Sequence, residues 1–511
     1  MATEANDDSI KSSIEGTGAN AIYRVGTLSY TRVGLGFLFL WLLWGDFCYT
    51  VMQSVTGPIM QLKFQALDAS NTEIALLLTS IPTALYSFLN PIISFRSDRF
   101  RSRFGRRIPF IAGSLPFLVL FLFALAYGEQ IGYWVRDHLG PLTMGIPPNQ
   151  VVILTLGLLL LLFTFFNTFV ASTFWYLFND VVPEFLLARF MSVFRAIGQL
   201  STALYSYYIF PQSSAHSTEI FISAAMLYLL GFGLMCWKVR EGEYPPPAPL
   251  IDGQTSTMAA VVTYARGTHA FPIYWYLWIC TFIGGIAGGA AIVGATTFGL
   301  YFYLALGLNL QQIGDINALL GVVVGVMTLG AGWLADRYHP IRVVVIGSFL
   351  SLVIVTPMNL IWLFWQPSPT MAFWVTMVIT FGLAAPSMAL GGMWDPPMLM
   401  RIFPRSQFGQ FCSTNAVWRS IGGIIGGFMT GIYLDYMKGL VGKEKAYFYL
   451  PIWALLFGIP SFLLLYRFYL SWKKLGGDEA YIPPVLETIQ LTNLPYPVEK
   501  VIIDSKEAPR N

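Results

Sequence analysis

About twelve stretches of mostly apolar residues, each long enough to cross a lipid bilayer, recur along this chain of 511 residues. A membrane-spanning helix needs about 20 such residues. The predicted helices occupy residues 33–59, 74–95, 108–127, 150–178, 190–211, 218–237, 272–305, 313–334, 343–364, 371–394, 409–433 and 447–470. Charged residues make up only 11% of the chain, against roughly 25% in a soluble domain. The sequence therefore predicts an all-α membrane protein with twelve transmembrane helices.

A polar, proline-rich stretch divides these helices into two sets of six. It contains the run EYPPPAPLIDGQTST and is the best linker in the chain. In chain order, the sequence predicts an N-terminal segment 1–32, a first six-helix bundle 33–237, a linker 238–270, a second six-helix bundle 271–471 and a tail 472–511.

An internal repeat supports two related bundles. The pair Asp98-Arg99 in SDRFRSRFGRR returns 238 positions later as Asp336-Arg337 in ADRYHPIR. Arg195 in FRAIG returns 224 positions later as Arg419 in WRSIG. Similar offsets at two places favour two homologous six-helix bundles.

The loop between the second and third predicted helices is strongly basic. From Asn90 to Phe110 it carries six arginines against one acid, Asp98. A short loop this basic stays on the cytoplasmic side of a membrane. Both termini and the linker are then cytoplasmic, and the lysines and arginines of the other predicted loops show the same bias. We expect an integral protein of the cell membrane, plasma or inner.

Composition also narrows the function. The net charge of +3 gives no reason to expect a nucleic-acid partner, and the sequence has no ATP-binding motif of a primary pump. The cysteines lie in or beside apolar runs without a C-x-x-C spacing, so neither a disulfide framework nor a metal site is expected. All four histidines fall in predicted loops, which disfavours an intramembrane enzyme. We expect no cofactor.

Four residues at membrane depth are the candidates for a binding site. Charges there are costly and persist mainly where they line a cavity or pair with each other. Asp46 lies within the first predicted helix, Arg195 in the fifth and Arg419 in the eleventh, while Trp175 lies in the fourth. Asp46 can accept hydroxyl groups of a solute, exchange a proton, or form a structural ion pair. The arginines can bind solute or serve helix packing, and Trp175 can stack on a sugar or belong to the core or the interfacial belt.

The basic loop resembles the loop signature of the major facilitator superfamily. Its long form, with SRFGRR followed by Pro-Phe, is similar to the sugar-carrying glycoside-pentoside-hexuronide symporters of the melibiose permease type and to plant-type sucrose transporters. Residues 44–47 (WGDF) resemble the helix 1 motif whose acid binds sugar, and residues 174–175 (FW) resemble the helix 4 pair whose tryptophan stacks on it. Arg195 and Arg419 fall where that family has sugar-contacting basic residues in helices 5 and 11. The resemblance implies the twelve-helix major facilitator fold and substrate binding by Asp46, Trp175, Arg195 and Arg419.

The sequence departs from the sodium-coupled members in two places. Their acidic pair on helix 2 is missing, since the region reads YSFLNPIISF with Ser87 and Asn90. Their second sugar-binding acid, in helix 4, is Ala171 here. Sodium coupling is therefore less expected than proton coupling through Asp46 or passive uniport.

The expected function is secondary transport of a sugar or glycoside, with a disaccharide as the first candidate, by a monomer that alternates access to the two sides of the membrane. The expected conformational latch, which would hold helix ends together, consists of Asp98, Arg99, Arg106, Arg107, Asp336 and Arg337. Transport of another polar organic solute and a sugar sensor without transport remain alternatives. Glycine-rich stretches in the seventh and eleventh helices indicate either close helix packing or gating.

Overall fold

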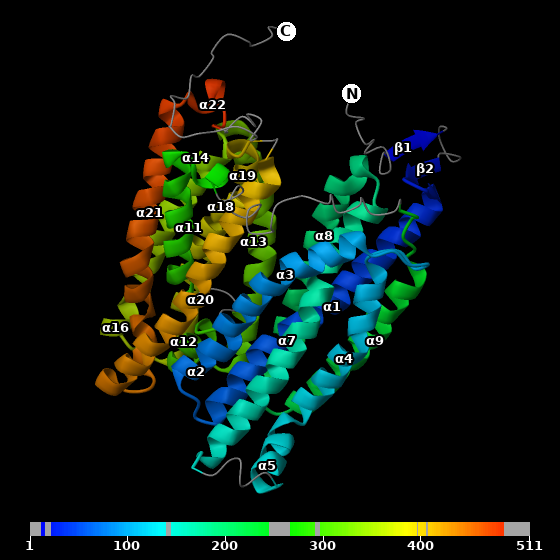
Figure 1. The fold of residues 1–511 in the computed structure, drawn as a ribbon. Helices are drawn as coiled ribbons and strands as arrows, with labels where there is room; N and C mark the ends of the chain where they lie inside the picture. The colour runs from blue at the N-terminus through cyan, green and yellow to red at the C-terminus, as the bar shows by residue number, and fades with distance from the viewer. Residues whose placement is uncertain are drawn as a thin grey trace, which may run out of the picture.

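The structure, a computed structural model, describes residues 12–15, 22–138, 145–244, 266–291, 297–395, 397–404 and 407–484. Helices that precede residue 245 form one group and those that follow residue 265 form another, and the two stand side by side (Figure 1). The groups diverge toward the side that carries strands β1 and β2 and helix α22, which we call the termini side (Figure 1). We call the opposite side, where α2 and α12 lie, the closed side.

The first group is built from long helices separated by short turns. Ser70 and Glu73 form a capping box at the start of α2, and prolines occupy the first turns of α4 and α7, where a missing N–H costs nothing. The elements are α1 Arg32–Ala66, α2 Asn71–Ala75, the π-helical turn η3 Leu76–Ser80, α3 Ile81–Arg99, α4 Ile108–Ala126, α5 Gly128–His138, α7 Pro148–Val181, α8 Glu184–Leu204, η4 Tyr205–Ile209, η5 Phe210–Gln212 and α9 Ser217–Lys238.

The second group contains more interrupted helices. Its elements are α11 Pro272–Gly288, α12 Gly299–Ala305, α13 Leu310–Tyr338, α14 Pro340–Leu350, η6 Ser351–Val355, α15 Thr356–Met358, α16 Ile361–Phe364, α17 Pro369–Ile379, η7 Thr380–Ala384, α18 Ala385–Gly391, η8 Gly392–Trp394, α19 Pro397–Ile402, α20 Phe408–Val441, η10 Lys445–Tyr449, α21 Leu450–Lys474 and α22 Gly477–Ala480.

The prediction of an all-α membrane fold is confirmed. Within the described residues, nine helices are long and apolar enough to cross a membrane, and α11 is a shorter apolar helix. The predicted fifth and eleventh membrane-spanning helices correspond to α8 and α20. With these two, the described residues account for all twelve predicted helices. These two helices carry Arg195 and Arg419, two of the four candidate site residues.

The structure corrects the predicted seventh helix. Residues 272–305 were expected to form one helix, but α11 ends at Gly288 and α12 begins at Gly299. Residues 292–296 lie outside the described part. The intervening sequence is rich in glycine, which is about 1 kcal/mol per residue less favourable than alanine in a helix.

A small antiparallel sheet precedes α1 and was not expected from the sequence. Its strands are β1 Ser12–Glu15, β2 Ile22–Val25 and β3 Leu28–Thr31, in the order β1-β2-β3. Gly26 takes a positive φ of 55° in the two-residue turn between β2 and β3. The ring of Tyr23 stacks on Phe185 at the start of α8, and the Thr27 hydroxyl accepts the N–H of Glu243 at 2.8 Å. The sheet thus joins the start of α8 to the chain after α9.

Residues after Trp472, expected to form a soluble extension, partly dock on the second group. The Asp478 carboxylate pairs with Arg342 at 2.5 Å, and the Tyr481 hydroxyl donates to the Ile402 carbonyl at 3.1 Å. Residues 485–511 of the predicted tail and residues 245–265 of the predicted linker lie outside the described part.

Candidate functional site

The two helix groups are joined on the closed side by a carboxylate of α20. One oxygen of Asp435 accepts the backbone N–H and the side-chain amide of Asn71 at 2.8 and 3.0 Å. The other accepts the N–H and hydroxyl of Thr72 at 2.9 and 2.6 Å. N–H groups in the first turn of a helix have no partner within that helix and favour a negative charge. Asp435 of the second group therefore caps the start of α2 in the first group.

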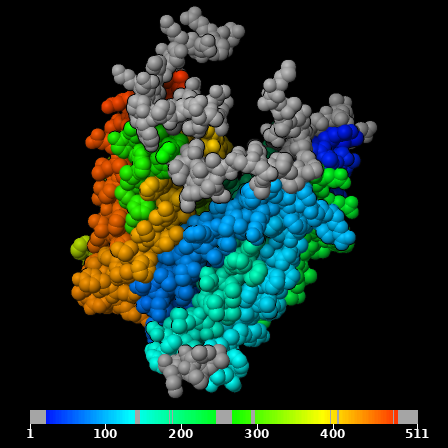
Figure 2. All heavy atoms as spheres, in the orientation of Figure 1, coloured from blue at the N-terminus to red at the C-terminus, as the bar shows by residue number. Residues whose placement is uncertain are grey.

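Further hydrogen bonds between the groups gather near this cap. The Tyr447 hydroxyl donates to Asn71 Oδ1 at 2.8 Å, and the Ser80 hydroxyl donates to the Ile424 carbonyl at 2.8 Å. Figure 2 shows the surface of α20, in orange, directly against the blue surface of α2 and α3.

A ridge of glycines on α20 continues this contact toward the middle of the molecule. A Cβ atom added at Gly431 would lie 2.7 Å from the Cα of Thr72, and one at Gly427 would lie 2.9 Å from the Ser80 hydroxyl. At Gly423 the nearest atom, a methyl carbon of Thr83, would be 3.9 Å away. These glycines recur every fourth residue, which defines one ridge of a helix surface. We call this contact the α20 seam.

The neighbouring glycines of α20 face their own group. A Cβ added at Gly426 would lie 2.5 Å from the Cα of Ile286 in α11. The predicted close packing of glycine-rich helices is therefore confirmed for two faces of α20. Only the face with Gly423, Gly427 and Gly431 contacts the other group.

A second seam, the α8–α13 seam, joins α8 and the turn η4 that follows it to α13. Gly314 packs against the backbone of Ser206, and a Cβ at Gly321 would lie 3.5 Å from Gln199 Oε1. One turn further, at Gly325, a Cβ would have no atom within 4 Å. The contact therefore ends between Gly321 and Gly325, and the groups separate toward the termini side.

The two predicted arginines lie where the seams end. Arg195 precedes Gln199 by four residues on α8, and Arg419 precedes Gly423 by four residues on α20, so each continues the ridge of its seam. Arg195 is exposed, and the side chain of Arg419 is 51% exposed. The residues that the internal repeat pairs thus occupy corresponding places, one on each helix group.

Trp175 and Asp46 lie on either side of Arg195 along α8. The Trp175 indole is 45% exposed and stands edge-on to Phe194, with ring centroids 5.2 Å apart. Asp46 is only 2% exposed and lies against Gly198, where an added Cβ would be 3.5 Å from Asp46 Oδ2. Trp175 and Asp46 therefore contact α8 at Phe194 and Gly198, within three residues of Arg195, and Arg419 belongs to the opposite group.

Asp46 is covered in this conformation and does not face an open cleft. Its Oδ1 accepts the Thr50 hydroxyl at 3.4 Å, and its Oδ2 is buried without a hydrogen-bond partner among the described residues. An unpaired oxygen of a buried carboxylate is costly when the group is charged.

The predicted latch divides into two parts. Arg107 pairs with Asp98 and also with Asp180, at 3.2 Å. Arg106 binds the same Asp180 through its Nη2 at 2.5 Å and its Nε at 2.9 Å. The other three predicted latch residues have different contacts. Arg99 lies over the ring of Phe95, Arg337 lies over the ring of Trp333, and Asp336 is 4.0 Å from Arg401.

Glu241 completes the network and was not expected from the sequence. Its carboxylate accepts the backbone N–H groups of Arg106, Arg107 and Ile108 at 2.6–2.9 Å, at the start of α4. Burial raises the pKa of Glu241, and the three N–H groups oppose that shift. The network lies wholly within the first helix group, so in this conformation it connects α3, α4, α7 and the chain after α9.

Two other acids, Asp395 and Asp435, lie near the seams and were not among the predicted site residues. Asp395 interrupts the apolar sequence in GGMWDPP, and Asp435 lies near the end of α20, so each is visible in the sequence as a charge. Asp395 is 24 positions from its partner Arg419, whereas Asp435 is 364 positions from its partner Asn71. No pattern in the sequence indicates the second pairing.

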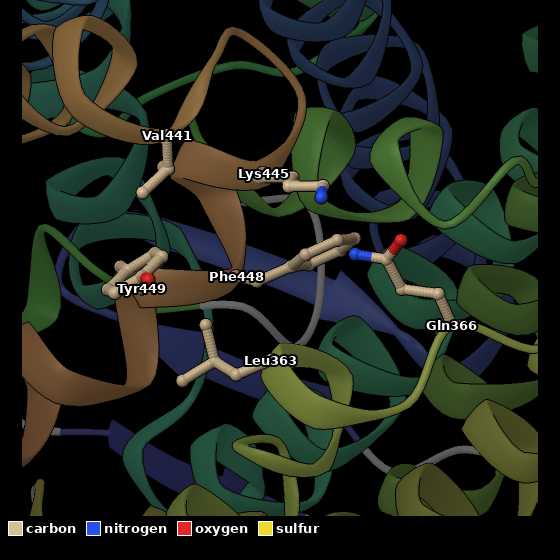
Figure 3. A pocket seen from close by; sticks show the side chains of 6 residues that line it. All are labelled: Leu363, Gln366, Val441, Lys445, Phe448 and Tyr449. Atoms are coloured by element: carbon tan, nitrogen blue, oxygen red, sulfur yellow. The ribbon is translucent and has the colours of Figure 1, made fainter.

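A cavity of about 330 Å³ lies elsewhere, beside α16 and η10 (Figure 3). It is lined by Leu363, Gln366, Val441, Lys445, Phe448 and Tyr449. None of the predicted site residues lines it.

Comparison with known proteins gives consistent matches for the fold. A family model described as Major Facilitator Superfamily matches residues 42–427. A bacterial homologue of the human lysosomal transporter Spinster, in an inward-facing and unoccupied conformation, is 17% identical with a TM-score of 0.60 over 86% of this chain and 99% of that one. The inward-open xylose transporter XylE from E. coli is 14% identical with a TM-score of 0.57 over 85% and 96%. A mutant form of the nucleoside transporter NupG is 13% identical with a TM-score of 0.59 over 84% and 98%.

Proposed function

The chain belongs to the major facilitator superfamily, and from this premise we propose that it carries a sugar or glycoside across the membrane by alternating access. It is an integral membrane transporter and not an enzyme. A transporter of this kind binds solute between its two helix groups and exposes the site to one side at a time.

The arrangement of Trp175, Arg195 and Arg419 supports this proposal most. A half-exposed indole can stack on the C–H face of a sugar. The two arginines supply several N–H donors from opposite helix groups, and these suit hydroxyl oxygens. We assign substrate binding to these three residues, with a disaccharide as the first solute to test. A different polar organic solute is the alternative.

The structure corresponds to a state open on the termini side. We place that side in the cytoplasm, as the basic loop predicts, so the state is inward-open. In the opposite state the α20 and α8–α13 seams would separate on the closed side and the groups would meet on the termini side. Asp98, Arg106 and Arg107, with Asp180 and Glu241, would keep the inner ends of the first group rigid during this rocking.

Asp46 is the proposed proton site. Its buried Oδ2 has no partner among the described residues, and a proton on the carboxylate would remove the cost of an uncompensated charge. Sodium symport has less support, because the chain has Ser87 and Asn90, and no carboxylate, in the region where the sodium-coupled symporters that it resembles have an acidic pair. Proton symport is therefore proposed ahead of sodium symport, with uniport as the alternative.

Uptake of labelled disaccharides into proteoliposomes tests the proposal. Wild type, Asp46→Asn and the surface variant Asp137→Asn are compared with and without an imposed inward proton gradient. Gradient-driven accumulation in wild type and Asp137→Asn, lost in Asp46→Asn, supports symport through Asp46. Equilibration that ignores the gradient identifies a uniporter. If folded wild-type protein moves no disaccharide, the solute class is wrong.

A further inference from the structure

Arg419 is held beside an acid at the open end of the α20 seam. Its Nη1 lies 3.2 Å from Oδ2 of Asp395, which directly follows η8. The side chains of Arg419 and Asp395 are 51% and 43% exposed. The pair is therefore accessible where the helix groups separate.

The backbone of α20 fixes the direction of this arginine. A Cβ added at Gly285 of α11 would lie 2.9 Å from the carbonyl oxygen of Arg419, so α20 packs tightly on α11 at this level. The preceding residue, Trp418, faces α11 and the chain before it, since its indole N–H donates to His269 Nε2 at 3.0 Å and its ring lies 6.0 Å from that of Phe282. Arg419 instead follows the ridge that faces the first group.

Stability does not account for this pair. An ion pair between half-exposed side chains contributes little to folding, because water screens it and both side chains lose conformational freedom. Among the described residues, one of the five N–H donors of the guanidinium is directed to Asp395. Within that part of the chain, the remaining donors of Arg419 and the second oxygen of Asp395 are available to a solute.

We propose that Asp395 determines specificity by selecting neutral, hydroxyl-rich solutes over solutes that carry a carboxylate or phosphate. This inference rests on the proposed function of the site and names its substrate class. A hydroxyl group donates one hydrogen bond and accepts others, so it can bridge Asp395 and Arg419 without displacing either. A carboxylate or phosphate accepts hydrogen bonds from Arg419 but is repelled by the negative charge of Asp395, which lies beside Arg419.

Removal of the acid changes this balance. In Asp395→Asn the guanidinium of Arg419 loses the acid that pairs with it, while Arg195 and Arg419 both keep their positive charges. Like charges brought together at a binding site cost several kcal/mol, and complementary charges gain. The ratio of anionic to neutral solute binding is therefore expected to rise roughly ten- to a hundredfold in Asp395→Asn.

The test measures this ratio in purified protein. Uptake of a labelled neutral disaccharide into proteoliposomes is inhibited by a panel of neutral disaccharides, a glucuronide and a sugar phosphate, and binding of the same panel is followed by thermal shift. Asp395→Asn and Asp395→Ser remove the charge, and Asp395→Glu retains it. Asp137→Asn is the matched control, because Asp137 is also an exposed acid that pairs with an arginine, Arg136, at 2.7 Å.

The expected result is a raised ratio in both neutral variants, with Asp395→Glu and Asp137→Asn close to wild type. An unchanged ratio in a folded variant overturns the role of Asp395 while the proposed function stands. If wild type binds and moves only the anionic members of the panel, this inference and the proposed neutral solute fail together.

Discussion

Replacing Asp435 with asparagine is expected to open the closed side of the protein. The carboxylate accepts four hydrogen bonds from Asn71 and Thr72 across the two helix groups. An asparagine retains one acceptor oxygen and turns an NH₂ group toward the N–H of Thr72. The variant thus loses the negative charge, and the NH₂ group of the asparagine and the backbone N–H of Thr72, both donors, face each other.

The size of the effect follows from the bonds that are lost. Hydrogen bonds to a charged group contribute about 1.5–3 kcal/mol each. Asp435 is only partly buried, so we take the lower end, about 1.5 kcal/mol, for each of two bonds and expect a loss of about 3 kcal/mol. At about 1.4 kcal/mol per tenfold change, the equilibrium moves roughly 100-fold toward the state that is open on this side.

Distances between two spin labels, one on α5 and one between α16 and α17, report this opening in lipid nanodiscs. The matched control is Asp68→Asn, because Asp68 also pairs across the groups, with Lys443 at 2.7 Å, but is 76% exposed. An exposed pair contributes about 0–1 kcal/mol, so this control should keep nearly the wild-type distances. A distance distribution in Asp435→Asn that matches wild type would refute the role of the Asp435 carboxylate in holding the two helix groups together on the closed side.

Three further variants test other parts of the structure. Gly427→Ala should also favour opening, by about 1–3 kcal/mol of overpacking, in the same distance measurement, whereas Gly439→Ala, with no atom within 4 Å, should not. Arg107→Ala should destabilise the protein by about 2–4 kcal/mol in thermal unfolding, because it removes one of the two arginines that pair with the buried carboxylate of Asp180. Arg103 is exposed, so Arg103→Ala should have little effect. Equal unfolding midpoints for the two variants would contradict the role of the network. Burial lowers the pKa of His339 to about 4, so between pH 4 and about pH 6.5 the unfolded chain binds a proton that the folded chain does not. The contribution of His339 to thermal stability should therefore be fully present above about pH 6.5 and decrease toward pH 4. A variant His339→Asn with the same pH dependence as wild type would contradict this.

The candidate site residues were predicted from the sequence, and their roles stay predictions. Arg195 and Arg419 were identified by their depth in apolar runs and by the internal repeat, and the structure places them at the open ends of two seams. Asp46 was expected to accept sugar hydroxyls, and this conformation covers it against Gly198. Burial of a side chain depends on the neighbouring helix, so the sequence of its own helix cannot reveal it.

The network around the basic loop shows the same limit. The six arginines of the loop were visible as a charge pattern. Only the structure shows that the side chains of Arg106 and Arg107 bind Asp180 and that their backbone N–H groups bind Glu241, while Arg99 lies over an aromatic ring. A charge pattern gives the side of the membrane, because each residue contributes independently to that preference. It does not give partners, because partners depend on how helices pack.

The sequence by itself determined that this chain spans a membrane with helices. This follows from local properties, since the length and polarity of each run are matched to the thickness of a bilayer. The relation between the two halves stays a prediction from the internal repeat. The tertiary structure decided which side is closed and which residues close it. Asp435 and Asn71 lie about 364 positions apart in the chain, and their contact exists only because the glycine ridge of α20 lets two helices of different halves approach closely.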